Sequence, residues 1–277
     1  MARASMLKTR ALTAAVLLVG FGSALFFLPQ PGWIVFCAAL LGIAGWEWAA
    51  LAALAGVTRS IYAAFLVLVF VSPLYAQGLA PSGLYGPVWV YGVSGLFWVF
   101  LAPLWIWRSA HVVSQAVLLA VGILVLVPAC AALVDLRSGH PALLLALLGT
   151  VWISDSAAYF VGRRFGRRKL APAISPGKTW EGVAGALVAV AVYAFGWALL
   201  GAPETRWAGG MRTAPGLLAI LLGLAVVGII GDLFESLIKR QAGVKDSGKL
   251  LPGHGGLLDR IDAPVAMLPL AVLAFMR

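Results

Sequence analysis

The acidic residues of this chain gather in its second half and recur at helical spacing. Eight of the ten occur from Asp155 onward. One group has offsets of three and four residues, so it falls on one stripe of a helix: Asp232, Glu235, Ser236, Lys239 and Arg240. Asp155 and Tyr159 are four residues apart on a second segment. Asp259 and Asp262 are three apart on a third. Carboxylates with no His or Cys among them suit a hard cation such as Mg²⁺.

Basic residues and glycines accompany these carboxylates between residues 236 and 262. The cations include Lys239, Arg240, Lys245 and Arg260, and glycines flank His254. Lys and Arg suit phosphate groups, and glycines let backbone N–H groups approach an anion. Carboxylates for a metal and cations for phosphate are the parts that phosphoryl chemistry needs. The segment therefore predicts a site for phosphate esters.

Long apolar segments must hold these residues in place. Apolar residues make up 62% of the 277 and charged residues only 11%, whereas an ordinary soluble domain has about 25% charged residues. A membrane helix needs about 20 apolar residues, so we predict an all-α integral membrane protein with about nine transmembrane helices. The expected spans are about residues 11–28, 32–56, 61–76, 88–107, 112–134, 142–161, 182–200, 216–238 and 263–276. The last of these is short for a span.

The distribution of Lys and Arg indicates the orientation of the chain. Basic loops stay on the cytoplasmic side of a membrane, and most Lys and Arg fall on one side if the N-terminus is inside. We therefore predict a cytoplasmic N-terminus and a polar active-site cavity that opens to the cytoplasm. This topology also accounts for the net charge of +10. No nucleic-acid partner is expected, because little solvated surface remains to present that charge.

A purely structural interpretation of the charged groups stays open at this point. The Asp232 stripe can pair with neighbouring helices while its long basic side chains extend toward the headgroups. Glu47, which stands between two tryptophans, is predicted to be a buried carboxyl hydrogen-bonded to a neighbouring helix rather than part of a substrate path. We favour a functional site for the three acidic groups, because ionisable residues at membrane depth usually face an interior cavity.

The stretch from Ser236 to Asp262 resembles the signature of the phosphatidate cytidylyltransferase family. That signature reads Ser-x-x-Lys-Arg-x4-Lys-Asp and then Pro-x-His-Gly-Gly-x-x-Asp-Arg-x-Asp, and every fixed position is occupied here. The resemblance extends upstream through residues 154–166 and 174–182 and through Gly231-Asp232. We expect a single multi-pass membrane domain over residues 1–277, with generic N-terminal helices in 1–140 and the catalytic signature region in 150–262.

The resemblance implies the reaction CTP + phosphatidate → CDP-diacylglycerol + pyrophosphate with Mg²⁺ as cofactor, a second metal or a monovalent cation being left open. It implies that Asp232 and Asp259 are the principal metal ligands and that Asp262 is a ligand or lies beside one. The two principal ligands are expected to form the catalytic set together with Lys239, Arg240, Lys245 and Arg260. The expected substrate-binding residues are Asp155, Tyr159, Ser175, Lys178, Thr179, Ser236, His254, Gly255 and Gly256.

Three of these assignments have a structural alternative or a second role. Asp262 can form an ion pair with a basic residue of the loop, Arg260 or Lys245, and merely order that loop. His254 can be a turn residue instead of a phosphate donor. Thr179 is a plausible N-cap of the helix that follows it, and this role is compatible with a contact to substrate.

The resemblance also implies in-line nucleotidyl transfer and a set of partners. A phosphate oxygen of phosphatidate is already an anion, so cations must chiefly neutralise the repulsion between two polyanions. The expected partners are CTP, phosphatidate, membrane lipids and a second copy of the chain in a homodimer, and the expected location is the inner membrane of a bacterium. The alternatives are a CTP-dependent kinase or cytidylyltransferase for a polyprenol or ether lipid, a transporter of a phosphorylated solute, and a structural scaffold.

Overall fold

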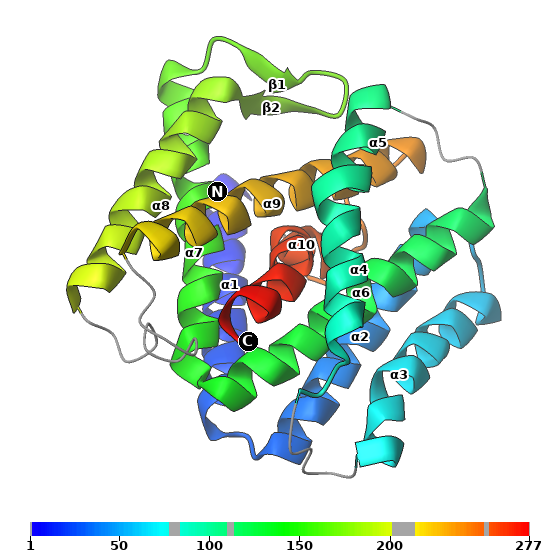
Figure 1. Ribbon diagram of the computed structural model, residues 1–277. Coiled ribbons are helices and arrows are strands. Elements are labelled where there is room, and N and C mark those ends of the chain that lie inside the picture. Colours follow the sequence, from blue (N-terminus) through cyan, green and yellow to red (C-terminus); the bar gives the residue numbers. More distant parts are fainter. Residues whose placement is uncertain (1, 78–83, 110–113, 201–213, 252–254, 277) are drawn as a thin grey trace.

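The computed structural model describes residues 2–77, 84–109, 114–200, 214–251 and 255–276, and most of them are helical (Figure 1). In chain order the helices are α1 (Ala2–Phe27), α2 (Gln30–Leu51), α3 (Val57–Gln77), α4 (Val88–Leu96), the π-helical segment η1 (Phe97–Leu101), α5 (Ala102–Arg108), α6 (Gln115–Gly139), α7 (Pro141–Phe165), α8 (Trp180–Leu200), α9 (Ala214–Gln241) and α10 (Leu258–Phe275).

The described chain is a multi-pass membrane protein. Within it, seven helical segments are long and apolar enough to cross a membrane: α2, α3, the continuous run from α4 to α5, α6, α7, α8 and α9. All nine predicted spans coincide with helices, although the ends differ by a few residues and α1 begins well before its predicted start. The first and last predicted spans correspond to α1 and α10. A total of about nine crossings and the orientation of the chain remain predictions.

The segment between α7 and α8 departs from the all-α prediction. It forms an antiparallel hairpin of β1 (Lys169–Ala171) and β2 (Ser175–Thr179), in which Lys169 pairs with Thr179 and Ala171 pairs with Ser175. Prolines and a glycine interrupt this segment and prevent helix formation. A hairpin lets the strands satisfy part of each other's backbone hydrogen bonds. In Figure 1 it lies at the top of the molecule, above α9.

Thr179 joins the hairpin to α8 as a helix cap. Its Oγ1 accepts a hydrogen bond of 3.1 Å from the backbone N–H of Gly182, three residues along, as an N-cap side chain does. The predicted capping role is therefore confirmed. The cap sets where the strand ends and the helix begins, and thereby fixes the position of the residue before it, Lys178.

α10 is the most enclosed helix of the bundle. Residues 263–269 are all buried, and the helix packs against α9, α6 and α4. A Cβ atom on Gly231 of α9 would lie only 2.6 Å from the backbone oxygen of Asp262. Because small residues allow helices to approach closely, Gly231 lets the polar ends of α9 and α10 meet.

Aromatic rings also pack against α9. Phe234 packs edge-on against three of them, with centroid distances of 5.3 Å to Phe97, 5.6 Å to Trp98 and 5.6 Å to Trp105. Two of these rings belong to η1, a π-helical interruption that changes the direction of side chains within a helix. Such edge-to-face contacts favour one rotation of α9 about its axis.

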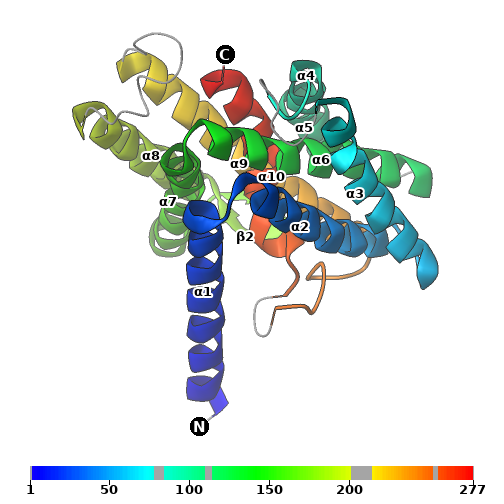
Figure 2. The ribbon, with the colours of Figure 1, turned by 90° about the horizontal axis from the view of Figure 1, so that it is seen from below.

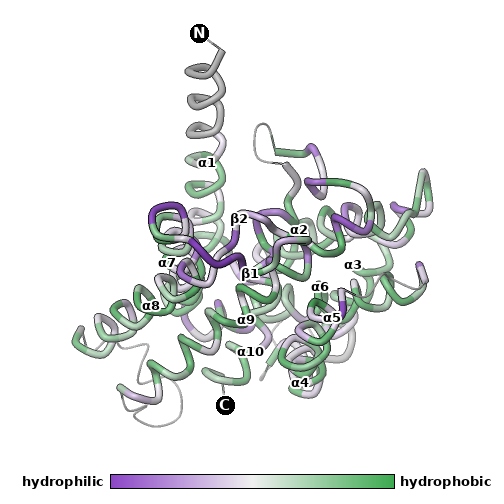
Figure 3. The backbone as a smooth tube through the Cα atoms, turned by 90° about the horizontal axis from the view of Figure 1, so that it is seen from above, coloured by the Kyte–Doolittle hydropathy of each residue, from purple (hydrophilic) through white to green (hydrophobic). Residues whose placement is uncertain are grey.

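Polar residues gather at one end of the molecule. Figure 3 shows hydrophilic residues along β1, β2, the C-terminal end of α7 and the chain between α9 and α10. In Figure 2, α1 extends away from the bundle, while the orange chain that precedes α10 lies beside α2. The end that carries the hairpin is thus the place where distant polar segments come together.

Candidate active site

The β hairpin is tied to α9 by two contacts of its β2 side. Lys178 Nζ lies 2.5 Å from Asp232 Oδ2. Arg240 Nε, two turns further along α9, donates a hydrogen bond of 3.3 Å to the backbone oxygen of Ile174. On α9 itself, Ser236 Oγ donates to Asp232 Oδ1 at 3.3 Å. Asp232 and Arg240 of the predicted stripe therefore face the hairpin.

A second ion pair joins α9 to α10. Lys239 Nζ lies 2.5 Å from Asp259 Oδ1 and 3.4 Å from Glu235 Oε2. The side chains of Lys239 and Asp259 are only 9% and 6% exposed, so this ammonium group is well shielded from solvent. A buried lysine needs such carboxylate partners, because an unpaired charge at this depth is costly.

Asp259 also holds the chain that leads into α10. Its Oδ2 accepts hydrogen bonds of 2.9 Å from the backbone N–H of Ser247 and 2.8 Å from that of Gly256. Burial raises the pKa of this carboxyl, but these hydrogen bonds and the one from Lys239 outweigh burial and hold the pKa below the ordinary value of an aspartate. Asp259 is therefore a stable anion at neutral pH.

One glycine of the signature is required by the backbone. Gly255 has φ of +87°, a region that residues with a Cβ rarely adopt. A Cβ there would also lie 2.6 Å from Asp259 Oδ2. The glycine lets the backbone at residue 255 lie close to the carboxylate, and Leu251 N–H donates to the Gly255 oxygen at 2.9 Å.

Further carboxylates surround Asp232. Asp155 of α7 and Asp262 of α10 both lie near enough to Asp232 for electrostatic interaction. Asp262 Oδ1 accepts a hydrogen bond of 2.8 Å from Ala263 N–H. Glu235 is buried and lies beside Lys239 and the carboxyl group of Asp262. The site therefore holds more carboxyl groups than the two that pair with Lys178 and Lys239 at 2.5 Å.

Some predicted site residues lie apart from this cluster. Tyr159 is 58% exposed, and its hydroxyl accepts a hydrogen bond of 2.8 Å from Arg163. Ser175 lies at the far end of β2 from Lys178. Lys245 and Arg260 are exposed. His254, with its predicted contact to phosphate, lies outside the described residues.

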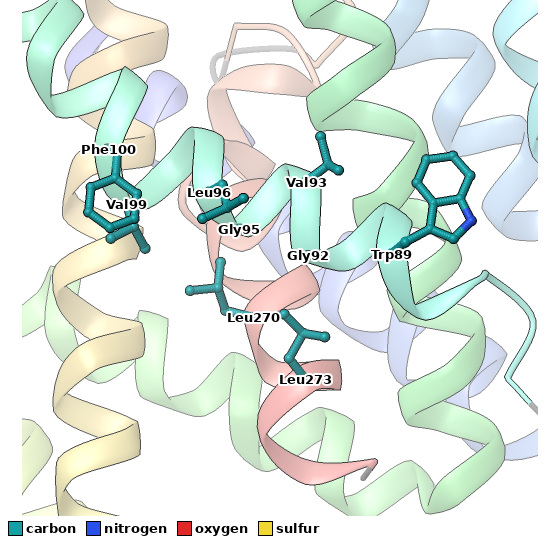
Figure 4. A pocket seen from close by; sticks show the side chains of 9 residues that line it. All are labelled: Trp89, Gly92, Val93, Gly95, Leu96, Val99, Phe100, Leu270 and Leu273. Atoms are coloured by element: carbon teal, nitrogen blue, oxygen red, sulfur yellow. The ribbon is translucent and has the colours of Figure 1, made fainter.

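Two grooves among the described residues are largely apolar, unlike the predicted polar cavity. One of about 470 Å³ lies between α4 and α10, with Trp89, Leu96, Leu270 and Leu273 among its walls (Figure 4). Another, of about 340 Å³, is lined by residues of α2 and α3 and by Leu250. The polar cluster instead lies beneath the hairpin, with Lys178 and Asp232 at 24% and 29% side-chain exposure.

Ser247 and Glu47, which the sequence did not assign to the site, are linked to it by hydrogen bonds. Ser247 Oγ lies 2.9 Å from Glu47 Oε2 and 3.2 Å from Asp259 Oδ2. Glu47 is 1% exposed and accepts from the N–H of Leu258, the first residue of α10, so the predicted buried carboxyl hydrogen-bonded to a neighbouring helix is confirmed. A carboxylate within an apolar segment was the available signal, but its partners stand about 200 positions further along the chain and could not be identified from spacing.

Comparison with known proteins places this cluster within a family. The sequence model of the cytidylyltransferase family matches residues 8–276. A phosphatidate cytidylyltransferase of Pseudomonas aeruginosa is 39% identical over 274 residues, which cover 95% of each chain. That of Haemophilus influenzae is 36% identical over 95% of this chain and 96% of its own. That of Thermotoga maritima is 40% identical over 131 residues, 47% of this chain and 48% of its own.

Proposed function

The chain belongs to the cytidylyltransferase family, and we propose that it transfers the cytidylyl group of CTP to phosphatidate, with CDP-diacylglycerol and pyrophosphate as products. One observation carries the proposal: β2, α9 and α10 bring Lys178, Asp232, Lys239 and Asp259 of the signature region into one cluster. The similarity to phosphatidate cytidylyltransferases over 95% of the chain supports the same activity.

The reaction is an in-line displacement at the α-phosphorus of CTP. A phosphate oxygen of phosphatidate forms the new P–O bond, the bond from the α-phosphorus to the bridging oxygen breaks, and pyrophosphate leaves with that oxygen. Because the attacking oxygen is already ionised, the protein needs to orient the groups and neutralise charge more than to remove a proton.

The cations of the cluster are the residues that we assign to charge neutralisation. Lys178 reaches the site from the hairpin, and Lys239 and Arg240 reach it from α9. Lys245 and Arg260 lie exposed at the same end, where a soluble triphosphate can meet them. Each ammonium or guanidinium group lowers the repulsion between substrates that both carry phosphate.

The donor chemistry of the cluster fits Mg²⁺. Ammonium groups already lie 2.5 Å from Asp232 and from Asp259, so both carboxylates stabilise a cation. No three His, Cys, Asp or Glu side chains of the described residues converge on one point, but Mg²⁺ is usually bound by one or two carboxylates with water and substrate phosphates. Asp232 and Asp259 would hold it, with Asp262 as a further ligand or beside one. When bound, Mg²⁺ would neutralise and align the phosphates of CTP.

The location of the substrates supports the predicted orientation. CTP is water-soluble and phosphatidate keeps its acyl chains in the bilayer, so the site must be accessible from both phases at the level of the headgroups. We propose that the hairpin end faces the cytoplasm, with the N-terminus on that side, and that the protein lies in the inner membrane of a bacterium. A homodimer remains an expectation from the family resemblance.

Labelled CTP distinguishes this activity from the alternatives. Purified protein with Mg²⁺ and phosphatidate is expected to transfer label from α-³²P CTP, and none from γ-³²P CTP, into chloroform-soluble product. A CTP-dependent lipid kinase would transfer the γ label instead. Parallel reactions with a polyprenol and with an archaeal-type ether lipid phosphate test the acceptor. Absence of α label in the lipid phase with phosphatidate would overturn the proposal, and label on another acceptor would redirect it.

A further inference from the structure

We propose that Glu47 is a positioning residue of the active site, which holds the turn before α10 so that Asp259 and Lys239 keep their geometry. The inference rests on the proposed cytidylyltransferase activity. Glu47 belongs to α2, in the half of the chain that carries none of the predicted site residues. It is only 1% exposed, so both carboxylate oxygens depend on protein donors.

Three donors of the signature region satisfy this carboxylate. Glu47 Oε1 accepts a hydrogen bond of 3.0 Å from Leu257 N–H, and Oε2 accepts one of 2.9 Å from Leu258 N–H. Ser247 Oγ donates to the same Oε2 at 2.9 Å. Glu47 therefore contacts this segment at two places, at residue 247 and at residues 257 and 258 at the start of α10. We call this set the Glu47 clamp.

The clamp supplies the N-terminal cap that α10 lacks in its own sequence. The first N–H groups of a helix have no partner within the helix, and Leu257, at the N-cap position, has no side chain that could accept one. Glu47 accepts from the N-cap and first-turn N–H groups in its place. Its negative charge at a helix N-terminus is also favourable, so the clamp fixes where α10 begins.

Two glycines of the signature region make room for the clamp. A Cβ on Gly248 would lie 2.5 Å from Glu47 Oε1, and a Cβ on Gly256 would lie 2.5 Å from Glu47 Oε2 and 2.1 Å from Ser247 Oγ. The carboxylate cannot move aside without giving up its three hydrogen bonds. The fit between Glu47 and these glycines is therefore a packing requirement.

Ser247 links the clamp to the charged cluster. Its Oγ lies 2.9 Å from Glu47 and 3.2 Å from Asp259, and its N–H donates to Asp259 at 2.9 Å. One hydroxyl proton cannot serve two carboxylates fully, so the closer Glu47 oxygen fixes the orientation of the serine. Displacement of the turn would move the N–H groups that hold Asp259, and with them its ion pair to Lys239.

Glu47→Gln tests the proposal with almost no change of shape. An amide has one acceptor oxygen, so either orientation of its NH2 group faces at least one N–H donor of the turn. We expect kcat per folded enzyme to fall at least about tenfold, since misplacement of about 1 Å at a reacting centre can cost a hundredfold. The KM for CTP should change by less than about threefold, and Glu47→Asp, which keeps the charge, should restore part of kcat.

Asp135→Asn is the matched control. Asp135 is also 1% exposed and also accepts hydrogen bonds from two backbone N–H groups and a hydroxyl, but its partners are Tyr85, Gly86 and Tyr91. The thermal midpoint can be followed with a thiol-reactive fluorophore, because both cysteines are buried. We expect the control to lose stability with kcat per folded enzyme within about twofold of wild type. Equal losses of kcat in both variants would show general loosening and overturn the proposal.

Hydrogen exchange separates this proposal from the proposed function. In Glu47→Gln, amides of a peptide covering residues 255–262 should exchange faster than in wild type, and those of α6 should not. Unchanged exchange there would overturn the clamp whatever the activity. Inactive wild-type protein would overturn the function alone. Should Glu47→Gln not fold, Ser247→Ala is the second variant, and an unchanged kcat in it would also contradict the proposal.

Discussion

Two buried carboxylates in the N-terminal half accept hydrogen bonds from the same kinds of donor but hold different parts of the chain. Glu47 of α2 accepts from two backbone N–H groups and the hydroxyl of Ser247. Asp135 of α6 accepts from the N–H groups of Tyr85 and Gly86 and from the hydroxyl of Tyr91, which we call the Asp135 clamp. The Glu47 clamp binds the segment that holds Asp259, whereas the Asp135 clamp binds the segment that leads into α4.

The comparison of Glu47 with Asp135 shows that burial and hydrogen bonding alone do not reveal a functional residue. Both carboxylates accept hydrogen bonds from backbone N–H groups that would otherwise be unpaired inside an apolar bundle. Only the position of the donors separates them: the donors of Glu47 adjoin Asp259, and those of Asp135 do not. Loss of the first should change catalysis, and loss of the second should change stability alone.

We expect the greatest loss of activity from a substitution in the charged cluster, which the Glu47 clamp adjoins. Asp232→Asn should lower activity at least about a hundredfold, because a metal ligand and the partner of Lys178 lose charge. The thermal midpoint should stay within a few degrees of wild type, and the Mg²⁺ concentration for half-maximal activity should rise. Incorporation of α-labelled CTP measures the loss. Activity close to that of wild type would leave the cluster with a structural role only.

The hairpin allows a comparison of two lysines within one element. Lys178 faces Asp232, whereas Lys169 Nζ donates to the backbone oxygen of Pro176 at 2.8 Å. Lys178→Ala should lower kcat/KM between about tenfold and a hundredfold, as loss of one charge-stabilising group does. Lys169→Ala should change it by less than about threefold. Similar losses in both variants would indicate that the hairpin matters through its fold and not through Lys178.

Gly256→Ala should disturb the Glu47 clamp through a residue that packs against Glu47. The new methyl group would overlap Ser247 Oγ and Glu47 Oε2, and such overpacking costs about 1–3 kcal/mol. We expect a lower thermal midpoint together with reduced kcat per folded enzyme. Gly196→Ala on α8 is the control, because nothing lies within 4 Å of its Cβ position. A midpoint loss without loss of kcat would separate the clamp from catalysis.

The smallest expected effect on activity lies on the Asp135 side. Tyr91→Phe removes the hydroxyl that donates to Asp135 and leaves a buried acceptor with one donor fewer. The free energy of unfolding should fall by about 1–3 kcal/mol, measured as a lower thermal midpoint. The kcat per folded enzyme should remain that of wild type. A kcat loss as large as that of Glu47→Gln would erase the distinction between the two clamps.

The local part of the site was predictable because its chemistry repeats along a helix. Ser236 and Asp232, and likewise Lys239 and Glu235, share a face at an offset of four residues, and the structure pairs each of them. The cap at Thr179 was predictable for the same reason, since a side chain and an N–H group three residues away interact whatever surrounds them. The hairpin was not predicted, because a short polar segment between long apolar ones carries little periodicity.

The membrane class, the helical segments and the family signature could be predicted from the sequence, because hydropathy, helical spacing and a motif are properties of neighbouring residues. Which carboxylates meet which cations depends on the folded arrangement of the helices. Lys178 pairs with Asp232 across 54 positions of the sequence, and Glu47 reaches Leu258 across 211. Such pairs depend on how helices pack, through Gly231 against α10 and through the glycines around Glu47. No local pattern encodes that packing, because it results from the summed fit of many side chains.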